Sequence, residues 1–501
     1  MTAPGTQVRL EAVAGWDVPA VRAGLHPLAE LDDALPSWRS RLDATARALA
    51  DEASWTGPAA APARELLLRL SCAAAALDAG FAESRAACGR LVRAAITASD
   101  RAATALALAA VLPVPLDDAI ADAESLAASV DRLVLGPGVT APAVAAAREA
   151  LSAAGAAEAA AARALDALPS AGPPGLAGLL DAAAAADLPL DVPVGSGPRR
   201  VARWWAALPA GAQLAVVGDA PGVVGALDGV PAWARDRANR ALLRQAVEDP
   251  SADDGLRETA RVVAALLAAE EAAGRPAQLH LLDLAGDRVV VGFGADLDSA
   301  AAVAVVVPGI YTSPRDDLGA VAADARDLAA AARRAEPGLA VAAVAWLGYR
   351  TPHTPGSVLT RSAAVRGGAA LDDALDGLAA ARGNAGAPRS RTTVVGHSYG
   401  TVVIDEAADR PGRLAADAVV LLGSPGMEDD AAALEAPEVH DAAAPGDPVS
   451  WAGWFGTETW AGRFGSAGLP TDPGTGHSGY FDADRPTLGA MGEVVAGGRP
   501  G

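Results

Sequence analysis

One stretch, residues 392–403, limits what this chain can fold into more than any other. It reads Thr-Thr-Val-Val-Gly-His-Ser-Tyr-Gly-Thr-Val-Val, so β-branched residues lead into Gly-x-Ser-x-Gly and an apolar helical pattern follows. This order predicts a strand, a sharp turn with Ser398 at its apex, and a helix. Side chains two positions either side of the serine would clash in such a turn, and Gly396 and Gly400 remove them. We therefore expect the Ser398 hydroxyl to stand clear of a sheet, at the positive end of a helix.

A serine becomes a nucleophile only with a base, and the base needs an acid to orient it. On an elbow of this kind the acid and then the histidine follow the serine in the chain. His477 lies in the Gly-rich loop 474–480, and Asp447 directly follows a predicted strand, 439–443. A surface-loop histidine and an ordinary Gly-Asp-Pro turn are the alternative interpretations. His440 and Asp441 lie inside the strand and are weaker candidates. The predicted triad is Ser398, Asp447 and His477.

The negatively charged oxygen of a tetrahedral intermediate needs two hydrogen-bond donors. We expect one to be the backbone N–H of Tyr399, directly after the nucleophile. The second should come from the loop after the strand that ends at Val307, where the sequence continues Pro-Gly-Ile-Tyr. We favour the N–H of Ile310, with Gly309 allowing close approach. A simple Pro-Gly turn is the alternative.

Aromatic residues follow two of the predicted strands. They lie at 346–349 and 451–455, with Trp460 further on. These side chains could line an apolar pocket, or could equally pack a long loop against the core. We find no metal-ligand cluster, P-loop or dinucleotide-binding glycine pattern, so neither a metal nor a cofactor is expected.

Residues 276–501 alternate strand and helix patterns. The strands are near-continuous apolar runs joined by helical crossovers, which predicts a mostly parallel sheet covered on both faces. Ala285-Gly286-Asp287 predicts a hairpin turn between the first two strands. The expected strands are 278–284, 288–293, 302–307, 339–346, 391–395, 416–422 and 439–443, with helices at 319–335, 369–381 and up to about 408.

The 501 residues are enough for two or three domains, and the first part of the chain is helical in pattern. Residues 1–168 are expected to form a helical bundle. Asp17 with Pro19 predicts a helix start, and apolar spacing of three and four predicts a hairpin over 17–112 that turns at Trp55-Thr56-Gly57-Pro58. Further helices are expected at 116–134 and 140–168, followed by a Pro/Gly-rich linker at 169–198.

The turn of this hairpin resembles that of the WXG100-like proteins of type VII secretion. The resemblance covers about 17–112 and rests on Trp55, Gly57 and the small residues Ala60 and Ala63. It implies export by that route and a helical protein partner. However, the export signal of those proteins, a tyrosine followed four residues later by an acidic residue, is missing. In the nearest segment, residues 81–85, neither Phe81 nor Arg85 matches it. A helical hairpin with a tryptophan-packed turn is the alternative.

Residues 199–275 form a further helical segment. Its landmarks are Trp204-Trp205, the Leu-Asp-Gly-Val-Pro run at 227–231 and Arg-Asp-Arg-Ala-Asn-Arg at 235–240. Together with the serine turn, these resemble the actinobacterial α/β-hydrolase family DUF1023, over about 200–485. The resemblance implies an α/β-hydrolase fold whose catalytic core follows a helical region packed on it, and Asp447 and His477 match the acid and base of that pattern.

Composition excludes several classes of function. The net charge is −21 and there is no long basic run, so nucleic-acid binding and attachment to anionic membranes are not expected. Cys72 and Cys88 are predicted to lie about 24 Å apart on one helix, too far to pair, and give no sign of an oxidising compartment. No signal-peptide or transmembrane pattern is present. We expect a cytoplasmic protein, with export by a type VII-like route as the alternative.

These patterns together predict a serine hydrolase of ester-like bonds. The substrate would be a small-molecule or lipid-like carboxylic ester or thioester, and the reaction would pass through an acyl-enzyme on Ser398. An acyltransferase would use the same residues. A different alternative is a secretion-linked helical binding protein with a vestigial hydrolase domain. The complete triad argues against that alternative, because a vestigial site is free to lose its members.

Overall fold

The computed structural model describes residues 6–50, 57, 59–112, 114–120, 141–166 and 192–499. The chain separates into two compact units. The first unit comprises residues 1–41 and 65–186, and the second unit comprises residues 42–64 and 187–501.

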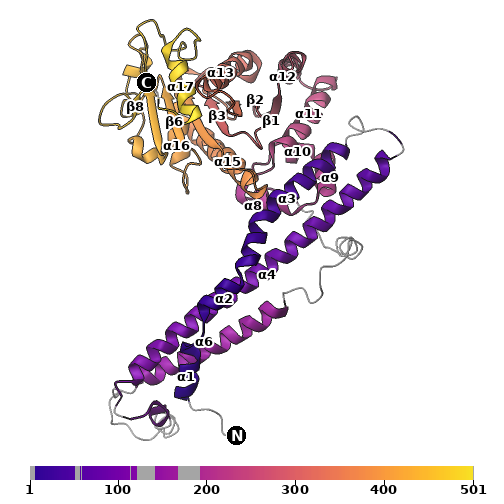
Figure 1. Ribbon diagram of the computed structural model, residues 1–501. Helices are drawn as coiled ribbons and strands as arrows, with labels where there is room; N and C mark the ends of the chain where they lie inside the picture. The colour runs from indigo at the N-terminus through magenta and orange to yellow at the C-terminus, as the bar shows by residue number, and fades with distance from the viewer. Residues whose placement is uncertain are drawn as a thin grey trace. The chain divides into compact units, whose positions relative to one another are not determined.

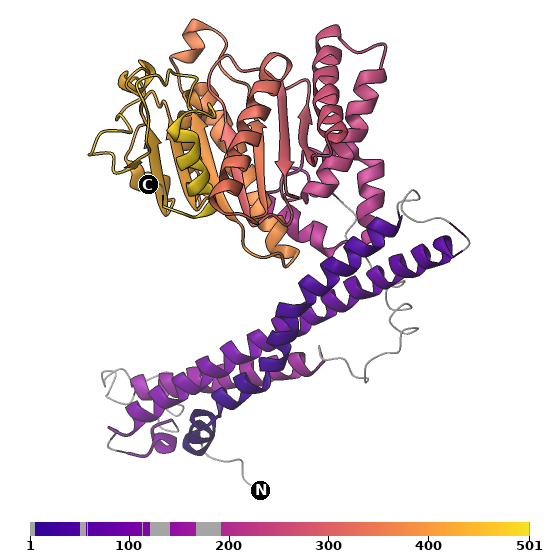
Figure 2. The same cartoon turned by 45° about the horizontal axis from the view of Figure 1, so that its top comes forward.

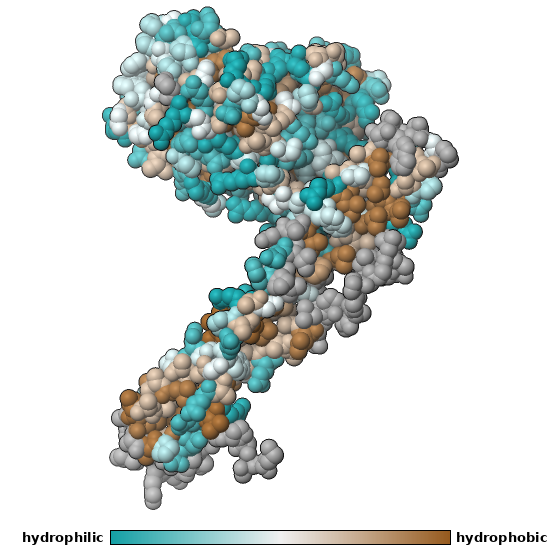
Figure 3. Space-filling model, in the orientation of Figure 1, coloured by the Kyte–Doolittle hydropathy of each residue, from teal (hydrophilic) through white to brown (hydrophobic). Residues whose placement is uncertain are grey.

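The first unit is built from long helices rich in alanine. Asp17 caps its second helix, accepting a hydrogen bond from the Ala20 N–H at 2.9 Å with a proline in the first turn, which confirms the helix start expected there. Its core consists mainly of alanines with Leu10 and Leu116, and the space-filling view shows apolar residues on its surface as well (Figure 3). The helices are α1 (Thr6–Ala14), α2 (Val18–Gly24), α3 (His26–Ala50), α4 (Ala60–Ala109) and α6 (Ala141–Asp166), of which α3 and α4 each have one end in the second unit.

Several sequence-based expectations fall outside the described residues. These are Trp55 in the proposed hairpin turn, most of the helix expected at 116–134, and most of the linker at 169–198. Cys72 and Cys88 both lie on α4 and are free thiols. In the described part of the chain, no helix is both long and apolar enough to cross a membrane.

The second unit contains a mostly parallel sheet of eight strands in the order β1-β2-β4-β3-β5-β6-β7-β8 (Figure 1). β1 and β2 form an antiparallel hairpin through Asp287, whose φ is +56°, and β2 also runs antiparallel to β4. All other neighbours are parallel, so the sheet expected from the sequence is confirmed. The strands are β1 (Ala277–Asp283), β2 (Arg288–Gly294), β3 (Ala302–Val307), β4 (Val341–Leu347), β5 (Arg391–His397), β6 (Ala418–Leu422), β7 (Glu438–Ala442) and β8 (Ala467–Gly468).

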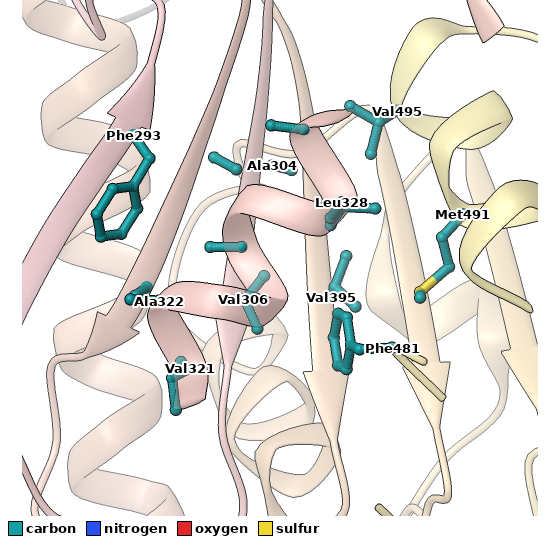
Figure 4. Close-up of a cluster of buried hydrophobic side chains, with 14 of the residues drawn as sticks. Phe293, Ala304, Val306, Val321, Ala322, Leu328, Val395, Phe481, Met491 and Val495 are labelled. Carbon is teal, nitrogen blue, oxygen red and sulfur yellow. The ribbon is translucent and has the colours of Figure 1, made fainter. Parts of the chain in front are cut away.

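Helices cover both faces of this sheet (Figures 1 and 2). On one face, α13 (Pro314–Ala335) and α17 (Pro486–Ala496) bury Val306, Leu328, Val395 and Met491 with the strands (Figure 4). On the other face, α15 (Ser362–Asn384) and α16 (Tyr399–Ala408) pack on the opposite sides of the same strands. The short helix α14 (Pro355–Val358) follows β4. Alternating residues of each central strand therefore serve two separate cores.

A helical segment before the sheet packs on its β1 edge. Leu243 of α11 (Ala232–Glu248) and Val263 and Leu267 of α12 (Asp254–Ala272) join the core of the sheet face that α13 covers. The tryptophans instead form their own cluster, in which the ring of Trp205 lies 5.8 Å from those of both Trp204 and Trp233. The remaining helices here are α8 (Pro198–Ala207), α9 (Ala210–Asp219) and α10 (Pro221–Val224).

Candidate active site

Ser398 sits at the turn between β5 and α16 in a backbone conformation that non-glycine residues rarely adopt. Its φ is +56° and its ψ is −126°. A Cβ at Gly396 would lie 2.7 Å from the Ile404 side chain, and one at Gly400 would collide with the carbonyl of Val307. The flanking glycines are therefore needed for the close packing of β3, β5 and α16 that holds this turn.

A chain of hydrogen bonds connects Ser398 to two residues from later in the sequence. The His477 Nε2 lies 2.8 Å from the Ser398 Oγ. On the other side of the ring, Nδ1 lies 2.9 and 3.0 Å from the two carboxylate oxygens of Asp447. The structure thus brings together the three residues that the sequence analysis selected. It does not place the weaker candidates there, since Asp441 instead accepts a hydrogen bond from the Ser466 hydroxyl at 2.8 Å.

The carboxylate of Asp447 is fully buried and is held by several donors. The hydroxyls of Tyr480 and Ser450 donate to Oδ2 at 2.7 and 2.9 Å, and the backbone N–H of Val449 donates to Oδ1 at 2.9 Å. Burial alone would raise the pKa of this carboxyl, but the hydrogen bonds from His477, Tyr480 and Ser450 outweigh it and hold the pKa well below its usual range. Asp447 is therefore ionised at every pH at which the protein would work.

Two neighbouring residues shape this arrangement and have no signal in the sequence pattern. Gly423, directly after β6, has a φ of +56°, and a Cβ there would lie 2.6 Å from Asp447 Oδ2 and 3.1 Å from His477 Nδ1. His397 places Nε2 2.6 Å from the backbone oxygen of His477. Burial lowers the pKa of His397 to about 4, so the ring is neutral, and it must carry its proton on Nε2 to make this bond. Gly423 thus leaves room for the imidazole of His477 beside Asp447, and His397 holds the backbone that carries it.

The loop after β3 lies against the nucleophile. A Cβ on Gly309 would lie 2.8 Å from the Ser398 Cβ, so only glycine fits without a shift. Among the described residues, the backbone N–H groups of Ile310 and Tyr399 have no acceptor, and both residues line the cavity in front of Ser398. The buried Tyr349 donates its hydroxyl to the carbonyl of Pro308 at 2.8 Å and so anchors this loop from behind.

Changing Tyr349 to phenylalanine is expected to lower kcat by about fivefold with little change in KM. One buried hydrogen bond contributes about 1 kcal/mol, and the loop it holds presents the Ile310 N–H. Steady-state ester hydrolysis measures the effect. Tyr311→Phe is the comparison: it removes a hydroxyl from the same loop at the cavity wall but keeps the Tyr349 bond, so it should alter KM at most and leave kcat unchanged. An unchanged kcat in Tyr349→Phe would mean that the loop does not depend on this bond.

A cavity of about 660 Å³ opens in front of Ser398. Of the aromatic residues noted in the sequence, Trp454 and Phe455 line it, whereas Trp451 and Trp460 contact each other in a tilted arrangement with ring centres 4.6 Å apart. Trp346 and Tyr349 are buried behind the loop after β3. In the described part of the chain, no group of three histidine, cysteine or acidic residues is arranged to hold a metal ion.

Comparisons with known proteins agree with this architecture. The family model described as alpha/beta hydrolase matches residues 285–453, and the sheet of the second unit is that of an α/β-hydrolase domain. Two uncharacterized proteins of Mycobacterium tuberculosis, from strains CDC 1551 / Oshkosh and ATCC 25618 / H37Rv, are each 29% identical over an alignment of 374 positions, and the match covers 61% of this chain. The matched region spans 56% of those relatives, so this chain matches only about half of their length.

Among solved structures, three esterases align with about half of this chain. An arylesterase is 10% identical with a TM-score of 0.30, covering 52% of this chain and 89% of its own. The esterase LipW from Mycobacterium marinum is 17% identical with a TM-score of 0.29, covering 51% and 94%. A hyperthermophilic esterase from Pyrobaculum calidifontis is 13% identical with a TM-score of 0.30, covering 52% and 97%.

Proposed function

We propose that the α/β-hydrolase domain is a serine hydrolase that cleaves carboxylic esters or thioesters through an acyl-enzyme. The observation that carries this proposal is the unbroken hydrogen-bond chain from Ser398 through His477 to Asp447, at the mouth of a largely apolar cavity. This is the constellation that makes a serine hydroxyl nucleophilic.

In the first half of the reaction, the Ser398 Oγ attacks the ester carbonyl while His477 Nε2 takes the hydroxyl proton. The backbone N–H groups of Tyr399 and Ile310 stabilise the negative oxygen of the tetrahedral intermediate. Asp447 holds the proton on Nδ1 and stabilises the imidazolium that forms. His477 then gives its proton to the departing alcohol or thiol, and the acyl group remains on Ser398.

In the second half, water replaces the alcohol in the cavity. His477 removes a proton from the water as it attacks the acyl carbonyl, and returns that proton to the Ser398 Oγ when the carboxylic acid leaves. The neutral His397 takes no part in these transfers. Its bond to the backbone oxygen of His477 keeps the imidazole within reach of both the serine and the water.

A fluorophosphonate probe tests the proposal directly. Because such a probe reacts with activated serines, we expect stoichiometric labelling, and peptide mapping should place the label on Ser398. Denatured protein is the control and should not react, since the activation depends on His477. Labelling at another serine, or none in the native protein, would contradict the proposal.

We further propose that the chain is related to the DUF1023 α/β-hydrolases and carries a WXG100-like hairpin. The landmarks of the first resemblance form an interlocked structure, in which Arg235 pairs with Asp228 at 2.5 Å and Asn239 donates to the carbonyls of Gly225 and Leu279. This network ties α11 to β1 and so supports a shared helical region on the catalytic core. For the second resemblance, the small residues Ala60 and Ala63 begin α4.

A further inference from the structure

The cavity at Ser398 draws its walls from both faces of the sheet. Val306, Val321 and Phe481 belong to the core that α13 and α17 cover. Tyr399 belongs to the core on the opposite face, and Ile310 and Phe455 pack against that core. Ser398 lies between these two groups of residues, at the end of β5. The acyl part and the alcohol part of a bound ester, here called its two arms, would therefore extend toward opposite walls of the cavity.

The cavity wall on the α13 side contains acidic residues. Asp317, Ala320, Val321 and Asp324 line the cavity at a spacing of three and four, so they form one face of α13. The carboxylate of Asp317 is engaged, because it accepts the backbone N–H of Ser313 at 2.8 Å. The carboxylate of Asp324 has no hydrogen-bond partner among the residues that the structure describes.

We propose that Asp324 determines specificity by selecting esters with a hydroxyl or ammonium group on one otherwise apolar arm and rejecting esters with a carboxylate there. This inference rests on the proposed ester hydrolysis at Ser398. The Asp324 carboxylate offers oxygens to a donor in a cavity whose lining is largely apolar, where a hydrogen bond is strong and directional. No arginine or lysine is among the described residues that line the cavity, so nothing there would compensate an anionic substrate.

The electrostatics around Asp324 point in the same direction. Burial, together with the like charges of Asp327 and Asp482, raises the pKa of Asp324 to about 7. These surroundings therefore disfavour negative charge even before a substrate enters. At pH 9, where Asp324 is ionised, a substrate carboxylate about 5 Å from it would weaken binding by roughly a hundredfold, whereas at pH 7 protonation of Asp324 would limit the loss to about twofold.

The test compares esters that differ only at the end of one arm. The first series consists of p-nitrophenyl esters of hexanoic acid, 6-hydroxyhexanoic acid and adipic acid, which end in methyl, hydroxyl and carboxylate. The second series carries the same ends on the alcohol, as butyrates of hexanol, 1,6-hexanediol and 6-hydroxyhexanoic acid. In one series, measured at pH 9 where Asp324 is ionised, we expect kcat/KM of the wild type to favour hydroxyl over carboxylate by about a hundredfold.

In that series, Asp324→Asn should reduce the preference to below about tenfold and change kcat/KM for the methyl-ended ester by less than about threefold. Asp316→Asn is the matched control, because it removes one exposed carboxylate from α13 that neither lines the cavity nor perturbs Asp324. The inference would be overturned if Asp324→Asn left the preference within twofold of the wild type in both series, or if Asp316→Asn changed the preference equally. Hydrolysis that survives in Ser398→Ala would overturn the proposed function itself.

Discussion

Ser398→Ala is expected to lower kcat for p-nitrophenyl butyrate by five to six orders of magnitude, on the order of what removal of a serine nucleophile costs elsewhere. Without the Oγ no acyl-enzyme can form, and only the oxyanion donors and the cavity would remain. The thermal midpoint should not fall, because the hydroxyl bonds only to His477 among the described residues. Turnover and thermal unfolding of the same preparation measure both effects.

A serine outside the site provides the control for that variant. Ser299 is exposed and far from the cavity lining, so Ser299→Ala should keep wild-type turnover and probe labelling. Esterase activity in Ser398→Ala above a few per cent of wild type would show that another residue performs the attack.

Asp447→Asn is expected to lower kcat by about 10⁴-fold while the protein stays folded. The amide would donate a hydrogen bond to His477 Nδ1, which fixes the proton on Nε2 and leaves no acceptor for the Ser398 hydroxyl. Turnover in the variant should therefore stay low across the pH range, because the wrong tautomer persists wherever the ring is neutral.

Asp441→Asn is the matched control, since Asp441 lies six residues earlier and is also buried. Its carboxylate accepts a hydrogen bond from Ser466, and burial raises its pKa to about 6. We expect turnover within a few-fold of wild type. If the Asp441 variant lost activity and the Asp447 variant kept it, the assignment of the acid would be wrong.

The strands β3, β4 and β6 were predictable because each is a continuous apolar run buried on both sides. β3 has the limits expected from the sequence, and the other strands that were expected begin and end within about two residues of prediction. Helix limits were less accurate. α15 begins at Ser362 instead of 369, because Gly367 and Gly368 lie inside it, where they allow contact with Tyr349 and the backbone of α16. Glycines disfavour a helix locally, and close packing between helices overrides that tendency.

The part of the site that could be predicted is the part that follows from the order of residues along the chain. A serine at a turn, an acid after a later strand and a histidine near the end can be found from spacing alone. Residues that act through three-dimensional contact could not be found in this way. Tyr480 reaches Asp447 from 33 positions away, and Tyr349 reaches Pro308 from 41. Nothing in their local sequence distinguishes either tyrosine from one that fills a core.

Residue 423 is a glycine, and this matters for judging which related proteins are active. A methyl group there would occupy the space in which the acid and the imidazole meet, so a relative with alanine or a larger residue at this position would have to move one of them. Such a relative could retain a perfect serine motif, an aspartate and a histidine in order and still be inert. Glycine after the sixth strand is therefore a sharper criterion for sorting working enzymes from inactive copies than the serine motif alone.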